Sequence, residues 1–180
     1  MPRGFQLKSC AIQLTENERT FPEDDVIVSK TDLKGRITYV NQTFMDVSGY
    51  TEEELLGKPH NIIRHPEMPR CVFKLMWDTL EARREIFAYV NNLCKNGDHY
   101  WVFAHVTPSF DASGRSVGYH SNRRVPERRA VELFDGLYRD LKKEEFKHPD
   151  PKRSMEAGGA LLQRLLADKK TTFDEFVFSL

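Results

Sequence analysis

The sequence contains few cysteines, and they do not form a recognised pattern. Cys10, Cys71 and Cys94 lie far apart, are odd in number, and include neither a Cys-x-x-Cys pair nor a zinc spacing. Free thiols in a reducing compartment are therefore the expected state. For Cys94, a reactive role is the alternative to simple burial, which is the common state of a free cysteine.

Long hydrophobic runs and an excess of either charge are also missing. No apolar run approaches the length needed to cross a membrane, and the first residues have no apolar segment typical of a signal peptide. The 27 Lys and Arg residues balance 27 Asp and Glu residues, so the formal net charge is zero. This balance argues against a strongly basic nucleic-acid surface. We expect a cytoplasmic protein that neither binds nucleic acid nor inserts directly into the membrane.

Sequence signatures of catalysis are absent as well. The chain has no nucleophile elbow, no glycine-rich phosphate loop and no metal-ligand set. An enzyme is therefore the least favoured class. A protein whose output is a conformational change needs none of these signatures.

What the chain does contain is a series of short strands separated by turn signals. Gly35 and the Asn96–Gly97 pair occupy positions where a hairpin needs a glycine. Five strands are predicted, at residues 26–31, 37–40, 86–94, 100–108 and 116–122. The order of two strands, helices and three strands predicts an α+β domain over residues 25–125. Its architecture would be a five-stranded antiparallel sheet with short helices over one face.

Helix signals fill the gap between the second and third strands. Asn41 begins one helix, and Thr51 with Glu54 forms a capping box at the start of the next. Apolar residues at helical spacing predict a third helix over residues 71–80.

Flanking segments are predicted on both sides of this domain. Residues 1–24 form an N-terminal extension whose scattered apolar positions, including Phe5 and Leu7, suit a short docking helix or strand. Residues 126–180 form a C-terminal helical extension that is interrupted at residues 148–151 and has a second capping box at Thr172. Its apolar stripes should pack on the sheet, on a second copy or on a receptor. Arg123 and Arg124, just before this extension, are predicted to belong to a solvated face.

The segment beginning at Pro59 is the most informative part of the chain. Its first twelve residues interleave two histidines, two arginines and a glutamate with three prolines. Polar groups on such a rigid, irregular segment cannot all be used in backbone pairing, so some are free to face a ligand.

Several motifs in residues 25–125 resemble a PAS domain, and specifically the flavin-binding PAS domains of aerotaxis receptors. The Ser-Gly-Tyr-Thr and Asn-Gly pieces are general to PAS domains, whereas the other pieces are more specific. The matching motifs are Thr31-Asp32-Leu33, Asn41 with Phe44, Ser48-Gly49-Tyr50-Thr51, Pro59-His60-Asn61, Arg64-His65-Pro66, Met68-Pro69, Met76-Trp77 and Lys95-Asn96-Gly97-Asp98-His99-Tyr100-Trp101-Val102.

This resemblance implies that FAD is held between the sheet and the overlying helices. Carried over position by position, with Phe73 added, it gives the candidate cofactor-binding residues Asn41, His60, Arg64, His65, Glu67, Phe73, Trp77 and Asn92. Glu67 stands where the family commonly has Asp. Ile86 stands where the family often has Trp, so an aromatic wall beside the flavin is lost or supplied by another residue.

Each candidate has a chemical role. Arg64 and His65 could neutralise part of a pyrophosphate, and Trp77 could stack on an aromatic ring. The Asn92 amide could bond the flavin's N5/O4 edge and reorient on reduction, which we take as the hypothetical switch. The alternatives are that Trp77 and Phe73 are ordinary core residues, that the histidines cap helices or bond carbonyls, and that Arg64 only pairs with Glu67.

The resemblance implies an oxygen-linked redox or energy sensor that signals by conformational change. Its partner would be a chemoreceptor-type signalling protein on a separate chain, as in a bipartite energy-taxis system. A homodimer through the flanking helices is a further expectation. Two alternatives stay open: a haem-binding gas sensor with His60 or His65 as the axial ligand, and a cofactor-free PAS module for dimerisation or adaptor binding.

Overall fold

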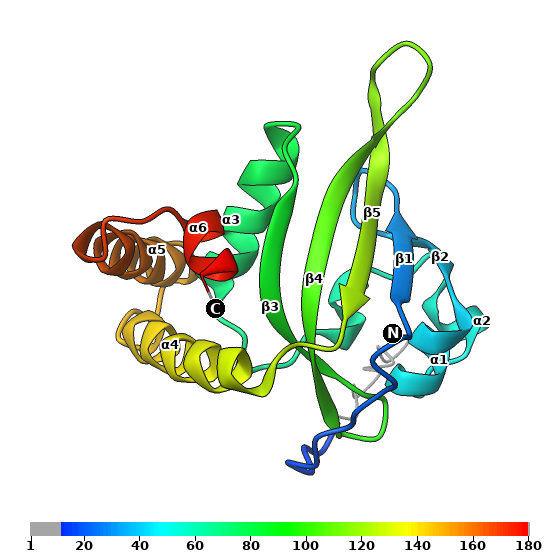
Figure 1. Ribbon diagram of the computed structural model, residues 1–180, viewed down its shortest axis with the longest axis horizontal. Coiled ribbons are helices and arrows are strands. Elements are labelled where there is room, and N and C mark those ends of the chain that lie inside the picture. The colour runs from blue at the N-terminus through cyan, green and yellow to red at the C-terminus, as the bar shows by residue number, and fades with distance from the viewer. Residues whose placement is uncertain (1–11, 180) are drawn as a thin grey trace, which may run out of the picture.

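The computed structural model describes residues 12–179, and its centre is a five-stranded antiparallel sheet (Figure 1). The strand order across the sheet is β2-β1-β5-β4-β3. The strands are β1 (Ile27–Thr31), β2 (Ile37–Val40), β3 (Ile86–Leu93), β4 (His99–Phe110) and β5 (Ser116–Arg124). The predicted sheet is confirmed. Strand β5 extends beyond its predicted end at residue 122, and this extension shapes the site described below.

Four short helical elements connect β2 to β3. They are α1 (Gln42–Ser48), α2 (Glu52–Leu55), the 3₁₀ helix η1 (His60–Ile63) and α3 (Arg70–Glu81). The capping box of α2 is present as predicted, since Thr51 and Glu54 satisfy each other's backbone N–H groups. These elements surround one face of the sheet, which leaves a hollow beneath α3.

The β1–β2 hairpin closes against α3 at a single glycine. Gly35 has a φ of +71°, a left-handed conformation that favours glycine. A Cβ at this position would lie 3.1 Å from the indole ring of Trp77. The turn therefore requires glycine both for its backbone conformation and for the close approach of Trp77.

The N-terminal segment runs along the end of β4 in an extended conformation. Glu18 forms a parallel bridge with His99, and the backbone N–H of Arg19 donates to the carbonyl of His99 at 2.7 Å. Asp98 accepts from Thr15 and Arg19. Residues 12–24 contain no helix. The predicted docking positions Phe5 and Leu7 lie outside the described residues.

Three helices follow the sheet: α4 (Arg128–Phe146), α5 (Pro151–Asp168) and α6 (Phe173–Phe178). The predicted break between the first two is confirmed, as is the capping box that starts α6. In Figure 1 these helices lie beside β3 and α3, at one edge of the sheet. No helix within residues 12–179 combines the length and the apolar character needed to cross a membrane.

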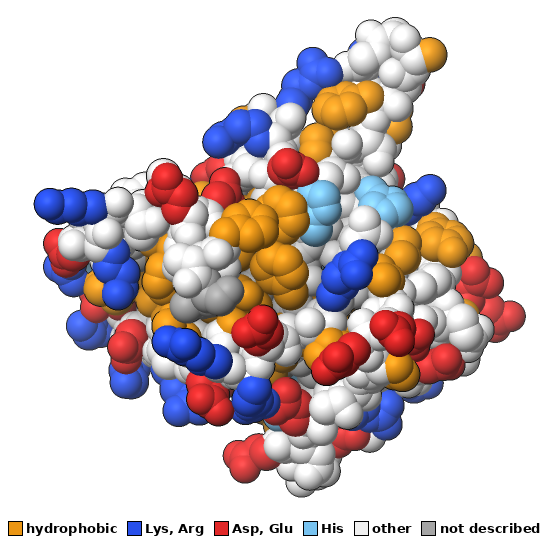
Figure 2. Space-filling view, viewed as in Figure 1, with side chains coloured by type: hydrophobic (Ala, Val, Ile, Leu, Met, Phe, Trp, Pro, Cys, Tyr) orange, Lys and Arg blue, Asp and Glu red, His pale blue; other side chains and the backbone are white. Residues whose placement is uncertain are grey.

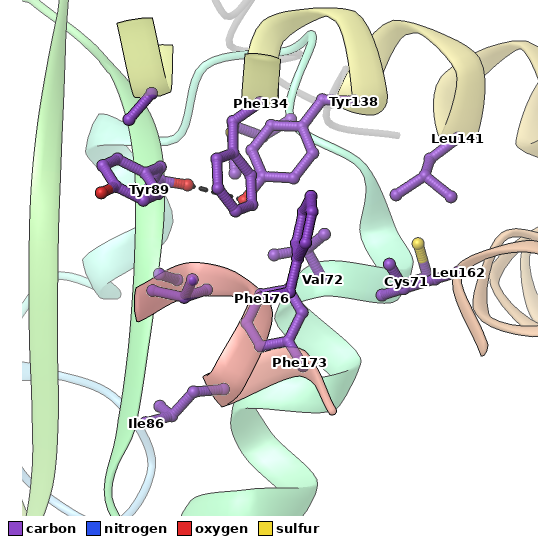
Figure 3. Close-up of a cluster of buried hydrophobic side chains, with 14 of the residues drawn as sticks. Cys71, Val72, Ile86, Tyr89, Phe134, Tyr138, Leu141, Leu162, Phe173 and Phe176 are labelled. Atoms are coloured by element: carbon purple, nitrogen blue, oxygen red, sulfur yellow. Dashed lines mark hydrogen bonds between the residues drawn. The ribbon is translucent and has the colours of Figure 1, made fainter. Parts of the chain in front are cut away.

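The C-terminal helices share one hydrophobic core with the sheet (Figure 3). The Tyr138 hydroxyl donates to the Tyr89 carbonyl at 2.7 Å, and the ring of Phe134 lies 4.6 Å from that of Tyr89. The cluster also includes Cys71 of α3 and Phe176 of α6. The C-terminal extension is therefore packed on the sheet, which is the first of the three expectations for its apolar stripes.

The remaining outer surface of the sheet is only partly covered. Figure 2 shows hydrophobic side chains gathered beside α6, with histidine side chains next to them. The residues concerned include Phe87, Phe103 and Phe178, whose rings contact one another, and His105, which stacks on Phe87 at 4.1 Å. Phe178 is 57% exposed.

Candidate functional site

A cavity lies between the inner face of the sheet and the elements that cover it. Its walls come from the sheet, the β1–β2 turn, η1 and α3. The space between these elements, including solvent at the mouth, is about 1080 Å³. No carboxylate lines it within residues 12–179, whereas Lys34, Arg64 and Arg123 all do.

Apolar and aromatic side chains form most of the lining. Phe73 and Trp77 contribute from α3, and Val90 contributes from the sheet below them. Tyr119 on β5 packs edge-on against Trp77, with ring centroids 5.4 Å apart and planes at 76°. Flat aromatic surfaces facing an apolar sheet suit a planar, ring-containing ligand.

Five buried side-chain atoms on the strands lack a hydrogen-bond partner within the described chain; two belong to Asn91 and Tyr100, outside the cavity lining, and three belong to residues that line it. The last three are the Asn92 Nδ2, the Ser121 Oγ and one terminal nitrogen of Arg123, NH1. All three residues line the cavity, and each is at most 8% exposed. Buried polar groups in folded proteins are nearly always paired. These three residues line the cavity, so a ligand with polar groups on an edge would lie beside them.

A buried cluster joins Arg123 to two neutral side chains. The Arg123 NH2 nitrogen donates to the Ser29 Oγ at 2.6 Å and lies 2.7 Å from the His60 Nε2. Burial lowers the pKa of His60 to about 3, and the charge of Arg123 adds to the effect. His60 is therefore neutral near pH 7 and accepts from Arg123 through Nε2.

The position of Arg123 corrects the prediction of a solvated arginine pair. Arg124 is exposed, but Arg123 is only 3% exposed and points to the opposite face of β5. Side chains alternate between the two faces of a strand, so Arg123 shares a face with Ser121 and Tyr119. Its burial lowers the pKa of its guanidinium to about 10.

Arg64 links the cavity wall to β3. It forms an isolated antiparallel bridge with Asn92 through the backbone. Its guanidinium donates to the Met68 carbonyl at 3.0 Å and lies 4.3 Å from the centre of the Phe73 ring. No ion pair with Glu67 is found within the described chain, so that alternative is not supported.

The cavity brings together a subset of the predicted cofactor-binding residues. Those that line it are His60, Arg64, Phe73, Trp77 and Asn92. Asn41, His65 and Glu67 do not line it.

These three residues have other roles or positions in the structure. The Asn41 amide bonds the backbone at both ends: its Oδ1 accepts from Val28 and Phe44, and its Nδ2 donates to Val26. His65 Nδ1 accepts from the backbone N–H of Glu67 at 3.2 Å. Glu67 is exposed to solvent. Motif spacing could not separate these structural roles from ligand contact.

Ile86 also lies away from the cavity lining. It is 2% exposed and belongs to the core shared with the C-terminal helices. The aromatic side chain that accompanies Trp77 at the cavity is Tyr119. Tyr119, Ser121 and Arg123 belong to no motif of the sequence, although alternation along a longer β5 places them on one face.

These features define a class: an α+β domain with a cavity between an antiparallel sheet and short helices. Residues 37–123 match the family described as the PAS fold, so this part of the chain is a PAS domain. It is 41% identical to the aerotaxis receptor of Escherichia coli (strain K12) over 71% of this chain. It is 29% identical to the nitrogen fixation regulatory protein of Klebsiella pneumoniae over 55% of this chain.

The matches cover only part of these relatives. The chain spans 25% of the length of the aerotaxis receptor and 20% of the nitrogen fixation protein. Among solved structures, a light-oxygen-voltage domain described with a flavin analogue has a TM-score of 0.54 and 22% identity. The match covers 68% of this chain and 87% of that one. The dark structure of the Aureochrome1 LOV photoreceptor has a TM-score of 0.52 and 21% identity, over 60% of this chain and 79% of that one. These structures share the fold.

Proposed function

We propose that the cavity binds FAD and that the domain is a redox or energy sensor. The supporting observation is the pairing of an aromatic wall with unpartnered polar atoms inside one cavity. The similarity to an aerotaxis receptor, and to a domain studied with a flavin analogue, points to the same ligand class. When bound, a flavin supplies reversible electron acceptance, which none of the side chains here provides.

The residues present fit such a ligand. Phe73 and Trp77 would cover the ring system, while Asn92 and Ser121 would bond its polar edge through the atoms that now lack partners. Arg64, half-buried, and Lys34, exposed, would meet the phosphates.

Asn92 is the side chain we assign to the switch. Its side-chain amide has both a donor and an acceptor. When the protonation of the ligand edge changes, the amide can rotate by half a turn and exchange the two. Asn92 is bridged to Arg64 through the backbone. A rotation of this amide would therefore shift the conformational equilibrium of the segment between Arg64 and α3.

A haem ligand fits this cavity less well. His60 Nε2 faces Ser29 and Arg123, so an iron bound there would lie beside a buried cation. His65 is outside the cavity lining, and its Nδ1 is already an acceptor. In the cofactor-free alternative, the unpartnered polar atoms of the cavity-lining residues would gain no ligand partner.

The test is the absorbance spectrum of the gently purified protein, followed by acid release and chromatographic identification of any pigment. Two flavin bands, with FAD released at close to one per chain, are expected. The Asn92→Ala variant should bind added FAD more weakly than wild type. Asn122→Ala, on the opposite face of the sheet, should bind it normally. A Soret band, or colourless protein that takes up no added FAD, would contradict the proposal.

We further propose that the output goes to a chemoreceptor-type signalling protein on a separate chain. Phe146 is 75% exposed and Phe178 is 57% exposed, at the ends of two C-terminal helices. Such residues suit contact with a partner protein or with a second copy of the chain. Co-purification of the tagged full chain with a candidate receptor, compared with the Phe146→Ser and Phe178→Ser variants, tests this. Light scattering of the purified chain tests the homodimer.

A further inference from the structure

Arg123 is a buried cation without a counter-charge. It is 3% exposed, and no carboxylate pairs with it within residues 12–179. It contacts the Ser29 hydroxyl, the neutral His60 imidazole and the ring of Phe44, whose centre lies 5.3 Å away. The buried hydroxyl of Tyr100 also lies near enough to act on its charge. Burial raises the pKa of Tyr100, so none of these groups is charged near pH 7.

Such an arrangement is costly unless something else completes it. A buried charge is normally paired with an opposite charge or fully hydrogen-bonded. Arg123 satisfies one of its terminal nitrogens through Ser29 and His60, but NH1 has no partner within the described chain. The residue lines the cavity, so a ligand bound there would lie beside this cation.

The other cations of the cavity differ from Arg123 in their surroundings. Lys34 is exposed, so solvent screens its charge. Arg64 is half-buried, and its guanidinium already meets the Met68 carbonyl and the Phe73 ring. Arg123 is the lining cation whose charge is least screened by water. Its effect on the charge state of a bound ring system should therefore be the largest.

We propose that Arg123 makes the cavity prefer the negatively charged, reduced state of its flavin, and so raises the flavin's midpoint potential. This inference rests on the proposed function. In the reaction considered, an external reductant such as dithionite gives two electrons to the oxidised ring, which takes one proton from solvent. The ring then carries one negative charge, and no bond to the protein forms or breaks. The positive charge of Arg123, on the sheet side of the cavity, stabilises that negative charge.

The chain offers a matched set of variants. Arg123→Met removes the charge but keeps an unbranched side chain, and Arg123→Lys keeps the charge but loses the forked donor geometry. Arg124→Met changes the neighbouring arginine, which is exposed on the other side of the strand. Two quantities are measured for each protein: the midpoint potential by spectroelectrochemistry, and the dissociation constants for FAD in its oxidised and dithionite-reduced states.

For Arg123→Met, the preference for reduced over oxidised FAD should fall about a hundredfold. For a two-electron couple this equals a drop of about 60 mV in midpoint potential. Arg123→Lys should stay within about tenfold of wild type, and Arg124→Met should match it. Without ligand, Arg123→Met should unfold at a temperature no lower than wild type, because it removes an unpaired buried charge.

The outcomes separate this inference from the proposed function. If wild type binds no flavin, both fail. If wild type binds FAD but Arg123→Met shows the same ratio of dissociation constants, the inference fails and the proposed function stands. A ligand-free Arg123→Met protein that is unfolded, or much less stable than wild type, would also overturn the inference, because Arg123 would then serve the fold.

Discussion

Glu145 on α4 holds the first turn of α3 through the backbone of Cys71. Its Oε1 accepts from the Cys71 N–H at 2.8 Å, and its Oε2 accepts from the Arg70 N–H at 3.0 Å. Helix α3 begins after Pro69, which supplies no side-chain cap of its own. The first N–H groups of a helix need acceptors, and a carboxylate there also favours the helix dipole. A helix of the C-terminal extension thus completes a helix that lines the cavity.

Removal of this cap should destabilise the whole domain. Glu145→Ala would leave two N–H groups without acceptors in a place where Glu145 itself is only 4% exposed. We expect a loss of about 2 kcal/mol in the free energy of unfolding, measured by urea denaturation. Glu156→Ala, at an exposed position on α5, is the control and should change it little. Equal stabilities for the two variants would contradict the capping role.

Acid should destabilise the ligand-free protein through His60. Its pKa is about 3 in the folded state because of burial and Arg123, against an ordinary value of 6.5. Between these values the unfolded chain binds more protons, so the free energy of unfolding falls as the pH falls. The slope for one such group approaches about 1.4 kcal/mol per pH unit.

Measurements between pH 6.5 and 5 avoid most of the carboxylate titration. His60→Gln should make the pH dependence shallower, although burial also lowers the pKa of His65, so some slope remains. A wild-type stability that stays flat over this range would show that His60 is not held neutral.

The Gly35 turn provides a test of the packing of Trp77. Gly35→Ala places a methyl group in a left-handed conformation and 3.1 Å from the indole ring. Gly114→Ala is a matched control, because its φ is +77° and nothing lies within 4 Å. The backbone cost alone is about 1 kcal/mol in each. Gly35→Ala should therefore lower the thermal unfolding temperature clearly more than Gly114→Ala does. Equal losses would mean that the Trp77 side chain moves away from the methyl group at no cost.

The buried thiols should be unreactive in the native protein. Burial, with Glu145, raises the pKa of Cys71 to about 12, and burial raises that of Cys94 to about 11. In a Cys10→Ser variant, a thiol reagent such as DTNB at pH 8 should label almost nothing until guanidinium is added, and then two groups. Rapid labelling of one thiol in the native protein would revive the reactive role considered for Cys94.

Local signals predicted most of the sheet and its turns. Gly35 and Gly97 both take positive φ where a hairpin needs it, and the capping boxes at Thr51 and Thr172 form as their spacing indicates. These features depend on residues a few positions apart, so the sequence carries them directly.

Long-range pairings were not accessible in the same way. The Glu145 cap joins residues separated by most of the domain, and no pattern marks Glu145 among the other charged residues of α4. Arg123 was missed because two adjacent arginines indicate a solvated surface, whereas the strand continues through both and buries one. A motif match carried Asn41 into the list of candidate ligand residues, but it does not say that the amide bonds the backbone of β1 and α1.

The backbone bridge between Arg64 and Asn92 ties the segment before α3 to the outermost strand of the sheet. The Arg64 guanidinium reaches Met68, two residues before the turn that Glu145 caps. Three short links thus join Asn92 to Glu145 on α4: the backbone bridge to Arg64, the bond from Arg64 to Met68 and the cap on Arg70. A substitution at Glu145, which does not line the cavity, should therefore weaken this communication more than it weakens ligand uptake.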